Sequence, residues 1–291
     1  MIVFYSKEPI NKGWSSDKKY CVTDANGVRY LLRVSDISQY DAKLAEFQVM
    51  QQLCSLGIPM CQPVDFGICD EGVYSVQSWI VGQDAEQVIA ECSSDQQYDY
   101  GFEAGRILRK IHSIPAPATQ QDWATFFNRK MDRKIEQYGK CPIKYPNGQL
   151  LIDYINANRH LLQNRPQTYQ HGDYHIGNMM IGDDGKLYII DFNRSDYGDP
   201  WEEFNRIVWC AQKSPLFASG LVNGYFDNAV PLEFWKLLAL YISSNTLSSV
   251  YWAIPFGQEE VDVMLNQAKQ VFAWYENMNR VVPTWYTGAK K

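Results

Sequence analysis

The first third of the chain alternates short apolar runs with polar turns. Residues 19–23 and 28–34 are rich in Val, Leu and Tyr, and Asn26-Gly27 lies between them. An Asn-Gly pair between two apolar runs is a strong hairpin signal. The pattern therefore predicts two antiparallel strands joined by a tight turn.

The apolar period changes to that of a helix at residues 41–56, where apolar side chains recur every three positions. Gly57 and Pro59 are expected to end this helix. Residues 74–80 predict a further strand, with Gly82 at its end. The N-terminal third thus predicts an antiparallel sheet that carries one helix.

The remainder of the chain is mostly helical in pattern. Residues 93–114, 121–137, 149–163 and 259–279 each place apolar residues on one stripe. Ser93 is a suitable N-cap for the first of these helices. Four basic residues of the second segment are expected on a solvated face: Arg129, Lys130, Arg133 and Lys134.

Composition and charge exclude several classes of protein. The chain has 291 residues, of which 46% are hydrophobic, so intrinsic disorder is excluded as its main state. A net charge of −6 argues against general nucleic-acid binding. The apolar runs are too short to span a bilayer, and the N-terminus has no signal-peptide pattern. We expect no nucleic-acid and no membrane partner.

The cysteines indicate a reducing compartment. There are seven, an odd number, and no two are spaced C-x-x-C. This usage predicts reduced, mostly buried thiols in a cytoplasmic protein.

Acidic residues are concentrated in residues 171–203. The segment holds two basic and eight acidic residues, a balance of −6 that equals the net charge of the whole chain. Such a concentration is either a solvated loop surface or a site for cations.

The same segment contains a predicted hairpin with polar residues at its outer ends. Residues 179–181 and 187–190 are apolar and flank an Asp-Asp-Gly turn at 183–185. Because a hairpin returns its ends to one edge, Asn178 and Asp191 are expected to lie close together. Their amide and carboxylate oxygens are ligands that suit Mg²⁺.

Asp173 precedes Asn178 by five residues, which is the spacing of the protein-kinase loop H-R-D-x-x-x-x-N. Asp191-Phe192-Asn193 stands where the kinase D-F-G would follow. Taken together, H-G-D-x-H-x-x-N, I-D-F and G-D-P-x-x-E resemble the aminoglycoside phosphotransferase and choline-kinase-like family. The matching residues are His171, Gly172, Asp173, His175, Asn178, Ile190, Asp191, Phe192, Gly198, Asp199, Pro200 and Glu203.

This resemblance implies an α+β, protein-kinase-like bilobal fold. Residues 1–81 would form the nucleotide-binding lobe, an antiparallel sheet with one helix. Residues 82–291 would form the mainly helical lobe with the catalytic loop, metal site and substrate pocket. The family's β3 lysine corresponds to Arg33 here, and its partner on the helix to Glu46. Arginine clamps phosphate through a planar fork, so this substitution puts ordinary nucleotide geometry in question.

The resemblance also implies the remaining nucleotide contacts. Residues 13–18 would cover the phosphates, with Ser15 and Ser16 as hydroxyl donors. The hinge that pairs with the base would begin at Gln77 and run to Gly82. Its candidate contacts are Gln77, Ser78, Trp79 and Ile80.

Other residues of the motif have supporting roles by the same resemblance. His171, His175 and Asp199 are expected to support the loop, although a phosphate or substrate contact is equally open for His175. Glu202 and Glu203 are either the start of a solvated helix or acidic contacts for a cationic substrate.

The resemblance implies an ATP- or GTP-dependent phosphotransferase that uses Mg²⁺. Asp173 would orient a substrate hydroxyl and accept its proton, Asn178 and Asp191 would hold the metal, and Arg33 would contact the α/β-phosphates. The expected partner is a small-molecule alcohol, with an aminoglycoside antibiotic, a polycation, as first choice. Choline, homoserine, sugars and macrolides remain alternative acceptors. A nucleotide-binding pseudokinase regulator is the alternative of another class, whereas a protein kinase is disfavoured because no A-P-E-type segment follows Asp191.

Overall fold

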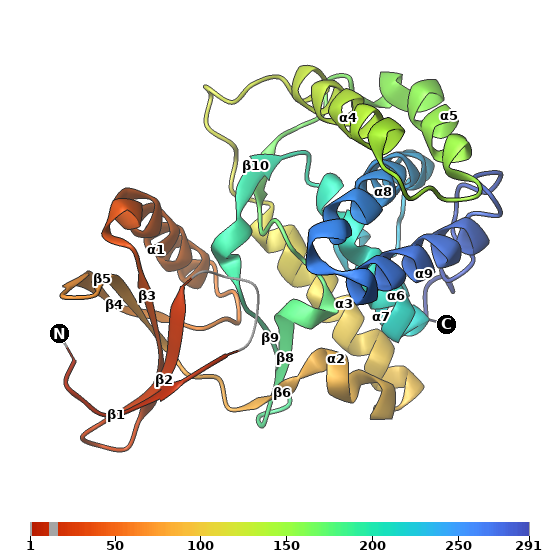
Figure 1. Ribbon diagram of the computed structural model, residues 1–291. Helices are drawn as coiled ribbons and strands as arrows, with labels where there is room; N and C mark the ends of the chain where they lie inside the picture. Colours follow the sequence, from red (N-terminus) through yellow and green to blue (C-terminus); the bar gives the residue numbers. More distant parts are fainter. Residues whose placement is uncertain (1, 12–16, 291) are drawn as a thin grey trace. The chain divides into compact units, whose positions relative to one another are not determined.

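The computed structural model describes residues 2–11 and 17–290, which form two compact units (Figure 1). The first unit runs from the N-terminus to Gln87 and also contains Asn178–Ser195. The second unit comprises Val88–Gly177 and the chain from Asp196 onward. The predicted hairpin after Asn178 therefore belongs to the same unit as the N-terminal sheet, whereas the division drawn from the sequence placed it with the helices.

The first unit is built on a five-stranded antiparallel sheet in the order β1-β2-β3-β5-β4. Helix α1 (Tyr40–Ser55) follows β3 after a short 3-10 turn and buries Phe47, Met50 and Leu53. The predicted antiparallel sheet with one helix is thus confirmed. The strands are β1 (Phe4–Pro9), β2 (Lys18–Asp24), β3 (Arg29–Ser35), β4 (Pro63–Cys69) and β5 (Gly72–Ser78).

The predicted turn between β2 and β3 forms as its residues require. Asp24 accepts hydrogen bonds from the backbone N–H groups of Asn26 and Val28, both at 2.9 Å. Gly27 has a φ of +78°, a conformation that glycine adopts without steric cost. The pattern missed β1, because its side chains are nearly all exposed, and β4, which begins with a proline.

A second, three-stranded sheet completes the first unit, in the order β6-β8-β9. It pairs β6 (Gly82–Asp84) with the predicted hairpin, β8 (Met179–Gly182) and β9 (Leu187–Ile189). Gly82 therefore begins a strand instead of ending β5. A Cβ atom at Gly82 would lie 2.3 Å from the carbonyl oxygen of Ile181, so only glycine permits this approach.

The second unit is mainly helical. Its core joins α4, α5, α8 and α9 around buried Phe127, Leu151, Tyr241 and Ala268. A two-stranded antiparallel sheet pairs β7 (Thr168–Gln170) with β10 (Asp196–Gly198). The helices are α3 (Ser94–Ile111), α4 (Trp123–Lys140), α5 (Gly148–Asn158), α6 (Ile207–Lys213), α7 (Pro215–Phe226), α8 (Leu232–Ala253) and α9 (Gln258–Trp274). In the sequence, the boundary between the two units falls within α2 (Ala85–Val88).

Ser93 caps α3 as expected. Its hydroxyl accepts from the backbone N–H of Gln96, and the Gln96 side chain accepts from the backbone N–H of Ser93, which is a capping box. The apolar periodicity of the sequence did not predict α7 and α8. Both helices are buried around almost their whole circumference, so they have no separate apolar stripe.

Helices α3 and α7 meet backbone to backbone through glycines spaced four residues apart. A Cβ atom at Gly101 would lie 2.1 Å from the carbonyl oxygen of Phe217, and one at Gly224 would lie 1.9 Å from that of Phe102. Gly105 and Gly220 show the same close approach. Side chains of any size are therefore excluded along this contact.

The seven cysteines are free thiols. Only Cys141 and Cys210 are fully buried, so the expectation that most would be buried is wrong. Within residues 2–11 and 17–290, no helix combines the length and apolar character that a membrane span requires.

Candidate active site

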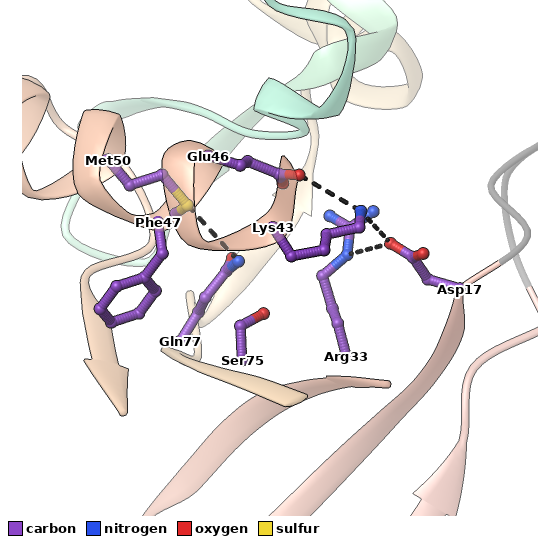
Figure 2. A pocket seen from close by; sticks show the side chains of 8 residues that line it. All are labelled: Asp17, Arg33, Lys43, Glu46, Phe47, Met50, Ser75 and Gln77. Carbon is purple, nitrogen blue, oxygen red and sulfur yellow. Dashed lines mark hydrogen bonds and ion pairs between the residues drawn. The ribbon is translucent and has the colours of Figure 1, made fainter. Parts of the chain in front are cut away.

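Arg33 lies in a small pocket of the first unit between β3 and α1 (Figure 2). Its side chain is buried and pairs with two carboxylates. Its Nε is 3.3 Å from Oδ2 of Asp17, and its Nη1 is 3.2 Å from Oδ1 of Asp191. Burial alone would lower the pKa of Arg33, but Asp191, Glu46 and Asp17 raise it overall, so the guanidinium is firmly charged.

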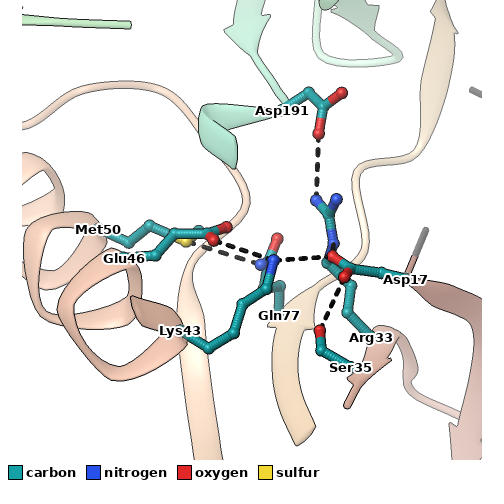
Figure 3. A network of polar contacts seen from close by, with 8 residues as sticks. All are labelled: Asp17, Arg33, Ser35, Lys43, Glu46, Met50, Gln77 and Asp191. Carbon is teal, nitrogen blue, oxygen red and sulfur yellow. Dashed lines mark hydrogen bonds and ion pairs between the residues drawn. The ribbon is translucent and has the colours of Figure 1, made fainter. Parts of the chain in front are cut away.

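The pocket extends into a network of alternating charges (Figure 3). Asp17 accepts from the Ser35 hydroxyl at 2.8 Å and from the Lys43 ammonium at 2.9 Å. Burial would raise the pKa of Asp17, but the hydrogen bonds from Lys43 and Ser35 lower it overall. Asp17 thus holds two cations, Arg33 and Lys43, at fixed positions.

Glu46 does not pair directly with Arg33, which corrects the sequence-based assignment. Its carboxylate lies 3.2 Å from Lys43, three residues earlier on α1, and among the described residues Arg33 pairs with Asp17 and Asp191 instead. The physical reason is competition, because Lys43 lies one helical turn from Glu46 and reaches it first. Glu46 therefore acts on Arg33 through the field of the network.

Asn178 and Asp191 lie at the open end of the β8–β9 hairpin, as predicted. The backbone N–H of Ile190 donates to the carbonyl oxygen of Asn178 at 3.0 Å, which places the two residues side by side. Asp191 has a φ of +68°, in the left-handed region, and its side chain is 36% exposed. Such strain at a polar residue is typical of functional sites.

These two residues fit a magnesium ion that also has phosphate ligands. They offer hard oxygen donors, and one of them carries charge. Across the described part of the chain, no group of three or more His, Cys, Asp or Glu side chains is placed to hold a metal. A metal here would therefore need oxygens from a bound ligand as well.

The first two residues of the expected hinge lie in strand β5. Gln77 and Ser78 still belong to β5, where they pair with Leu31 and Tyr30 of β3. Gln77 is buried and its amide lies 3.6 Å from the sulfur of Met50. Both the Ser78 hydroxyl and its backbone N–H are bonded to Gln62. Gln77 lines the pocket that holds Arg33, and the Ser78 hydroxyl is an acceptor within the sheet.

Trp79 and Ile80 follow the strand and remain the candidate hinge residues. Trp79 is half-buried, with the guanidinium of Arg29 5.6 Å from its ring centroid. Ser15 and Ser16, the expected phosphate contacts, lie outside the described residues.

The loop that carries Asp173 is part of the second unit, and side chains hold its backbone. Asp173 N–H donates to Nδ1 of His171 at 3.3 Å, and Gly177 N–H donates to Nδ1 of His175 at 3.1 Å. His171 is fully buried. These contacts are those of loop-supporting residues.

Glu203 supports the same loop through hydrogen bonds to its backbone. It is buried, and its Oε1 accepts from the backbone N–H groups of Gly172 at 2.9 Å and Tyr174 at 3.4 Å. Its Oε2 lies 3.7 Å from Nε2 of His112, whose Nδ1 contacts the Tyr225 hydroxyl. This corrects its expected substrate contact, because a buried carboxylate with these partners does not face a ligand.

Asp199 is the centre of a buried polar cluster. The Arg165 guanidinium donates hydrogen bonds to both carboxylate oxygens of Asp199, at 2.7 and 3.0 Å. The Tyr241 hydroxyl donates to Oδ2 at 2.6 Å. The backbone N–H of Trp201 donates to Oδ1 of Asp199, and the Arg165 guanidinium stacks on the Trp201 ring. Asp199 thereby braces the chain that follows β10.

The Asp173 carboxylate lies among charged side chains of its own unit. Its Oδ1 is 3.3 Å from Nε of Arg206 and 3.6 Å from Nε2 of His175. Glu202, the other expected substrate contact, pairs with Lys130 at 3.3 Å. A carboxylate oriented in this way can receive the proton of a hydroxyl group.

The sequence reasoning missed Asp17, Lys43, Arg165 and Arg206. Only two of these had a usable signal. Asp17 lies within the loop proposed for phosphate contacts, and Arg206 lies three residues after the last residue of G-D-P-x-x-E. Lys43 and Arg165 become visible only when the fold brings them to Asp17 and Asp199.

Comparison with known proteins identifies the class. Residues 7–235 match the family model of the phosphotransferase enzyme family, APH. The structure of aminoglycoside 2'-phosphotransferase-IIIa in its GDP complex superposes with a TM-score of 0.69 at 16% identity, covering 94% of both chains. An apo thermostable mutant of aminoglycoside phosphotransferase APH(4)-Ia gives a TM-score of 0.66 at 14% identity, covering 93% of this chain and 94% of that one.

An amicoumacin kinase bound to AMP-PNP and Ca²⁺ is similarly close, with a TM-score of 0.65 at 16% identity, covering 95% of this chain and 90% of that one. No curated protein sequence matches this chain significantly. The fold is thus the α+β, protein-kinase-like fold of small-molecule phosphotransferases. The chain belongs to the phosphotransferase enzyme family and is a small-molecule kinase.

Proposed function

We propose that this protein transfers the γ-phosphate of ATP or GTP to a hydroxyl group of a small molecule. Asp173 orients the acceptor hydroxyl and accepts its proton as the oxygen attacks phosphorus. Three side-chain acceptors, those of His171, His175 and Glu203, fix the backbone around it. Positioning and charge stabilisation account for most of the rate acceleration in such reactions.

Arg33 is the proposed contact for the nucleotide phosphates. Its Nη2 is buried and has no hydrogen-bond partner among the described residues, so one donor remains for a phosphate oxygen. Solved structures with this fold contain ADP, GDP and AMP-PNP, which supports a nucleotide ligand. Asn178 and Asp191 would hold Mg²⁺, which neutralises charge on the phosphates when bound.

The observation that carries the proposal is the ion pair of Arg33 with Asp191. It links the buried cation on β3 to the carboxylate that ends the β8–β9 hairpin. A phosphate contact and a metal ligand must lie this close to act on one nucleotide. Trp79 and Ile80, directly after β5, are the candidate contacts for the base.

We propose an aminoglycoside as the first-choice acceptor of the phosphate. Several solved structures with this fold are aminoglycoside phosphotransferases, and hygromycin B and gentamicin are bound in two of them. The amicoumacin kinase demonstrates that similar chains act on other compounds. Choline, homoserine, sugars and macrolides are the alternative acceptors.

Calorimetry with AMP-PNP, with and without Mg²⁺, tests the nucleotide site directly. The wild type is expected to bind AMP-PNP more tightly with Mg²⁺, and Asp191→Ala to lose that metal dependence. Asp183→Ala, an exposed acid in the same hairpin, is the matched control. Unchanged metal dependence in Asp191→Ala overturns the metal assignment, and no nucleotide binding by the wild type overturns the kinase proposal in favour of another role.

A further inference from the structure

The direction of the Asp173 carboxylate is not determined by the backbone of its loop. His171, His175 and Glu203 hold that backbone by accepting hydrogen bonds from its N–H groups. An aspartate side chain still has two torsions, and rotation about the terminal one is broad. Contacts of the carboxylate itself must therefore set its direction.

Two side chains lie against the same oxygen of Asp173. Nε of Arg206 is 3.3 Å from Oδ1, and Nε2 of His175 is 3.6 Å from it. His175 belongs to the loop itself, whereas Arg206 comes from a separate element and keeps its charge at any working pH. The side chains of Asp173 and Arg206 are 16% and 29% exposed, so water screens this pair less than a surface ion pair.

Arg206 is itself held at a fixed place in the fold. It is the last residue of the 3-10 helix Glu202–Arg206, and α6 follows directly. The next residue, Ile207, is fully buried and anchors the chain at this point. Trp209, three residues after Arg206, packs its ring against that of His175, with centroids 6.3 Å apart. The start of α6 thus contacts the loop at two points.

We propose that Arg206 is a positioning residue of the phosphoryl transfer: its guanidinium holds the Asp173 carboxylate in the direction in which it meets the acceptor hydroxyl. The inference rests on the proposed function, because it takes Asp173 as the group that orients the hydroxyl and receives its proton. A displacement of reacting groups by about 1 Å can cost about 10²-fold in rate. Without Arg206 the carboxylate adopts other rotamers, so the hydroxyl is correctly oriented for a smaller fraction of the time.

A double-mutant cycle in turnover separates this role from a structural one. The four proteins are the wild type, Asp173→Asn, Arg206→Met and the double variant. Turnover is measured by transfer of radiolabelled γ-phosphate from ATP and GTP to gentamicin, choline, homoserine, glucose and erythromycin. Hydrolysis, with water as the acceptor, is measured in the same samples. The cycle uses the nucleotide and the acceptor that give the fastest wild-type turnover, water included.

Arg206→Met is expected to lower kcat about 10- to 100-fold and to leave the Kd of Mg²⁺–AMP-PNP within about twofold of the wild type. In the Asp173→Asn background the same substitution is expected to lower kcat less than about threefold, because the group that Arg206 positions has already been removed. Arg206→Lys, which keeps the charge, is expected to recover part of the loss.

Arg159→Met is the matched control. Arg159 is also partly buried and pairs with an aspartate of the same unit, Asp132, at 2.7 Å. Its loss removes an ion pair of the same kind, so this variant is expected to turn over as the wild type does. Urea unfolding shows which variants are folded, and Arg206→Lys takes the place of Arg206→Met in the cycle if the latter is not.

Three results overturn the inference when the wild type is active. They are turnover of Arg206→Met within about threefold of the wild type, an equal loss in both backgrounds, and a raised KM for the acceptor with unchanged kcat. The second would give Arg206 a structural role, and the third would make it a contact of the acceptor. Absence of wild-type turnover with every acceptor, water included, overturns the proposed function and the inference with it.

Discussion

The Nη1 atom of Arg33 lies 3.2 Å from Oδ1 of Asp191, so a residue of β3 and the end of the β8–β9 hairpin are joined by an ion pair. A lysine at position 33 would offer one point charge, whereas the guanidinium contacts Asp191 and Asp17 with different nitrogens. The arginine thus has a geometric reason in this chain, since it connects two carboxylates that one ammonium would have to share.

Two substitutions of Arg33 should distinguish the contribution of its positive charge from that of its planar guanidinium group. Arg33→Lys is expected to lower kcat/KM about 5- to 30-fold, the loss of one charge-assisted contact, and Arg33→Ala to lower it further. Initial rates and AMP-PNP affinity measure both effects. Lys7→Ala, an exposed lysine on β1, is the control, and a silent Arg33→Ala would contradict the assignment.

Glu46 should couple to Lys43 more strongly than to Arg33. A double-mutant cycle of Glu46→Gln with Lys43→Met is expected to give about 0.5–1.5 kcal/mol of coupling in urea unfolding, because the two side chains are in contact. The cycle of Glu46→Gln with Arg33→Lys is expected to give less. Equal or reversed couplings would restore the direct pair that the sequence suggested.

Asp173→Asn keeps the size of the side chain but removes the proton acceptor. Turnover is expected to fall about 10²- to 10⁴-fold, while affinity for Mg²⁺–AMP-PNP is retained. Steady-state kinetics and calorimetry on the same preparation separate the two effects. Asp183→Asn should behave as the wild type, and near-normal turnover of Asp173→Asn would show that another group receives the proton.

Asp199 should be a stability residue. Asp199→Asn leaves the Arg165 guanidinium without its paired carboxylate in a buried site, which is expected to cost about 3–5 kcal/mol in free energy of unfolding. Glu276→Gln, which breaks the exposed pair with Arg280, should cost less than about 1 kcal/mol. Urea denaturation measures both, and a small effect at Asp199 would mean that Tyr241 and Trp201 suffice to hold the loop.

Lys134 should give the protein a pH-dependent stability of defined sign. Its pKa is about 7 in the folded chain against an ordinary value of 10.5, so between these values the unfolded chain binds more protons. The free energy of unfolding is therefore expected to rise as the pH rises through this range, and to carry the full penalty below pH 7. Lys134→Met should flatten that rise, whereas Arg133→Met should not; identical pH profiles for wild type and Lys134→Met would contradict the assignment.

The sequence predicted those parts of the fold that depend on local periodicity and turn chemistry. The Asp24–Gly27 turn, the Ser93 cap and the β8–β9 hairpin all form where their residues indicated. Helices α7 and α8 were missed because burial on every side removes the polar half of the pattern.

The sequence predicted only those parts of the candidate site whose residues are close together in the chain. Short spacing placed Asn178 next to Asp191, because a hairpin determines that distance. Asp17 is a partner of Arg33 and Arg206 is a partner of Asp173, and both come from other parts of the chain. Lys43 joins the network only through Asp17 and Glu46. Among mutually compatible charges, the sequence alone does not determine which pairs form.

The glycine contact between α3 and α7 has a consequence for how the chain tolerates change. At Gly101 and Gly224 the obstacle to a larger residue is backbone carbonyl, which no rotamer change can move aside. The first methyl group therefore forces the helices apart, and further atoms add comparatively little. Substitution of these glycines is therefore tolerated either fully or not at all. Alanine, which is elsewhere the mildest replacement, is here expected to be nearly as disruptive as leucine.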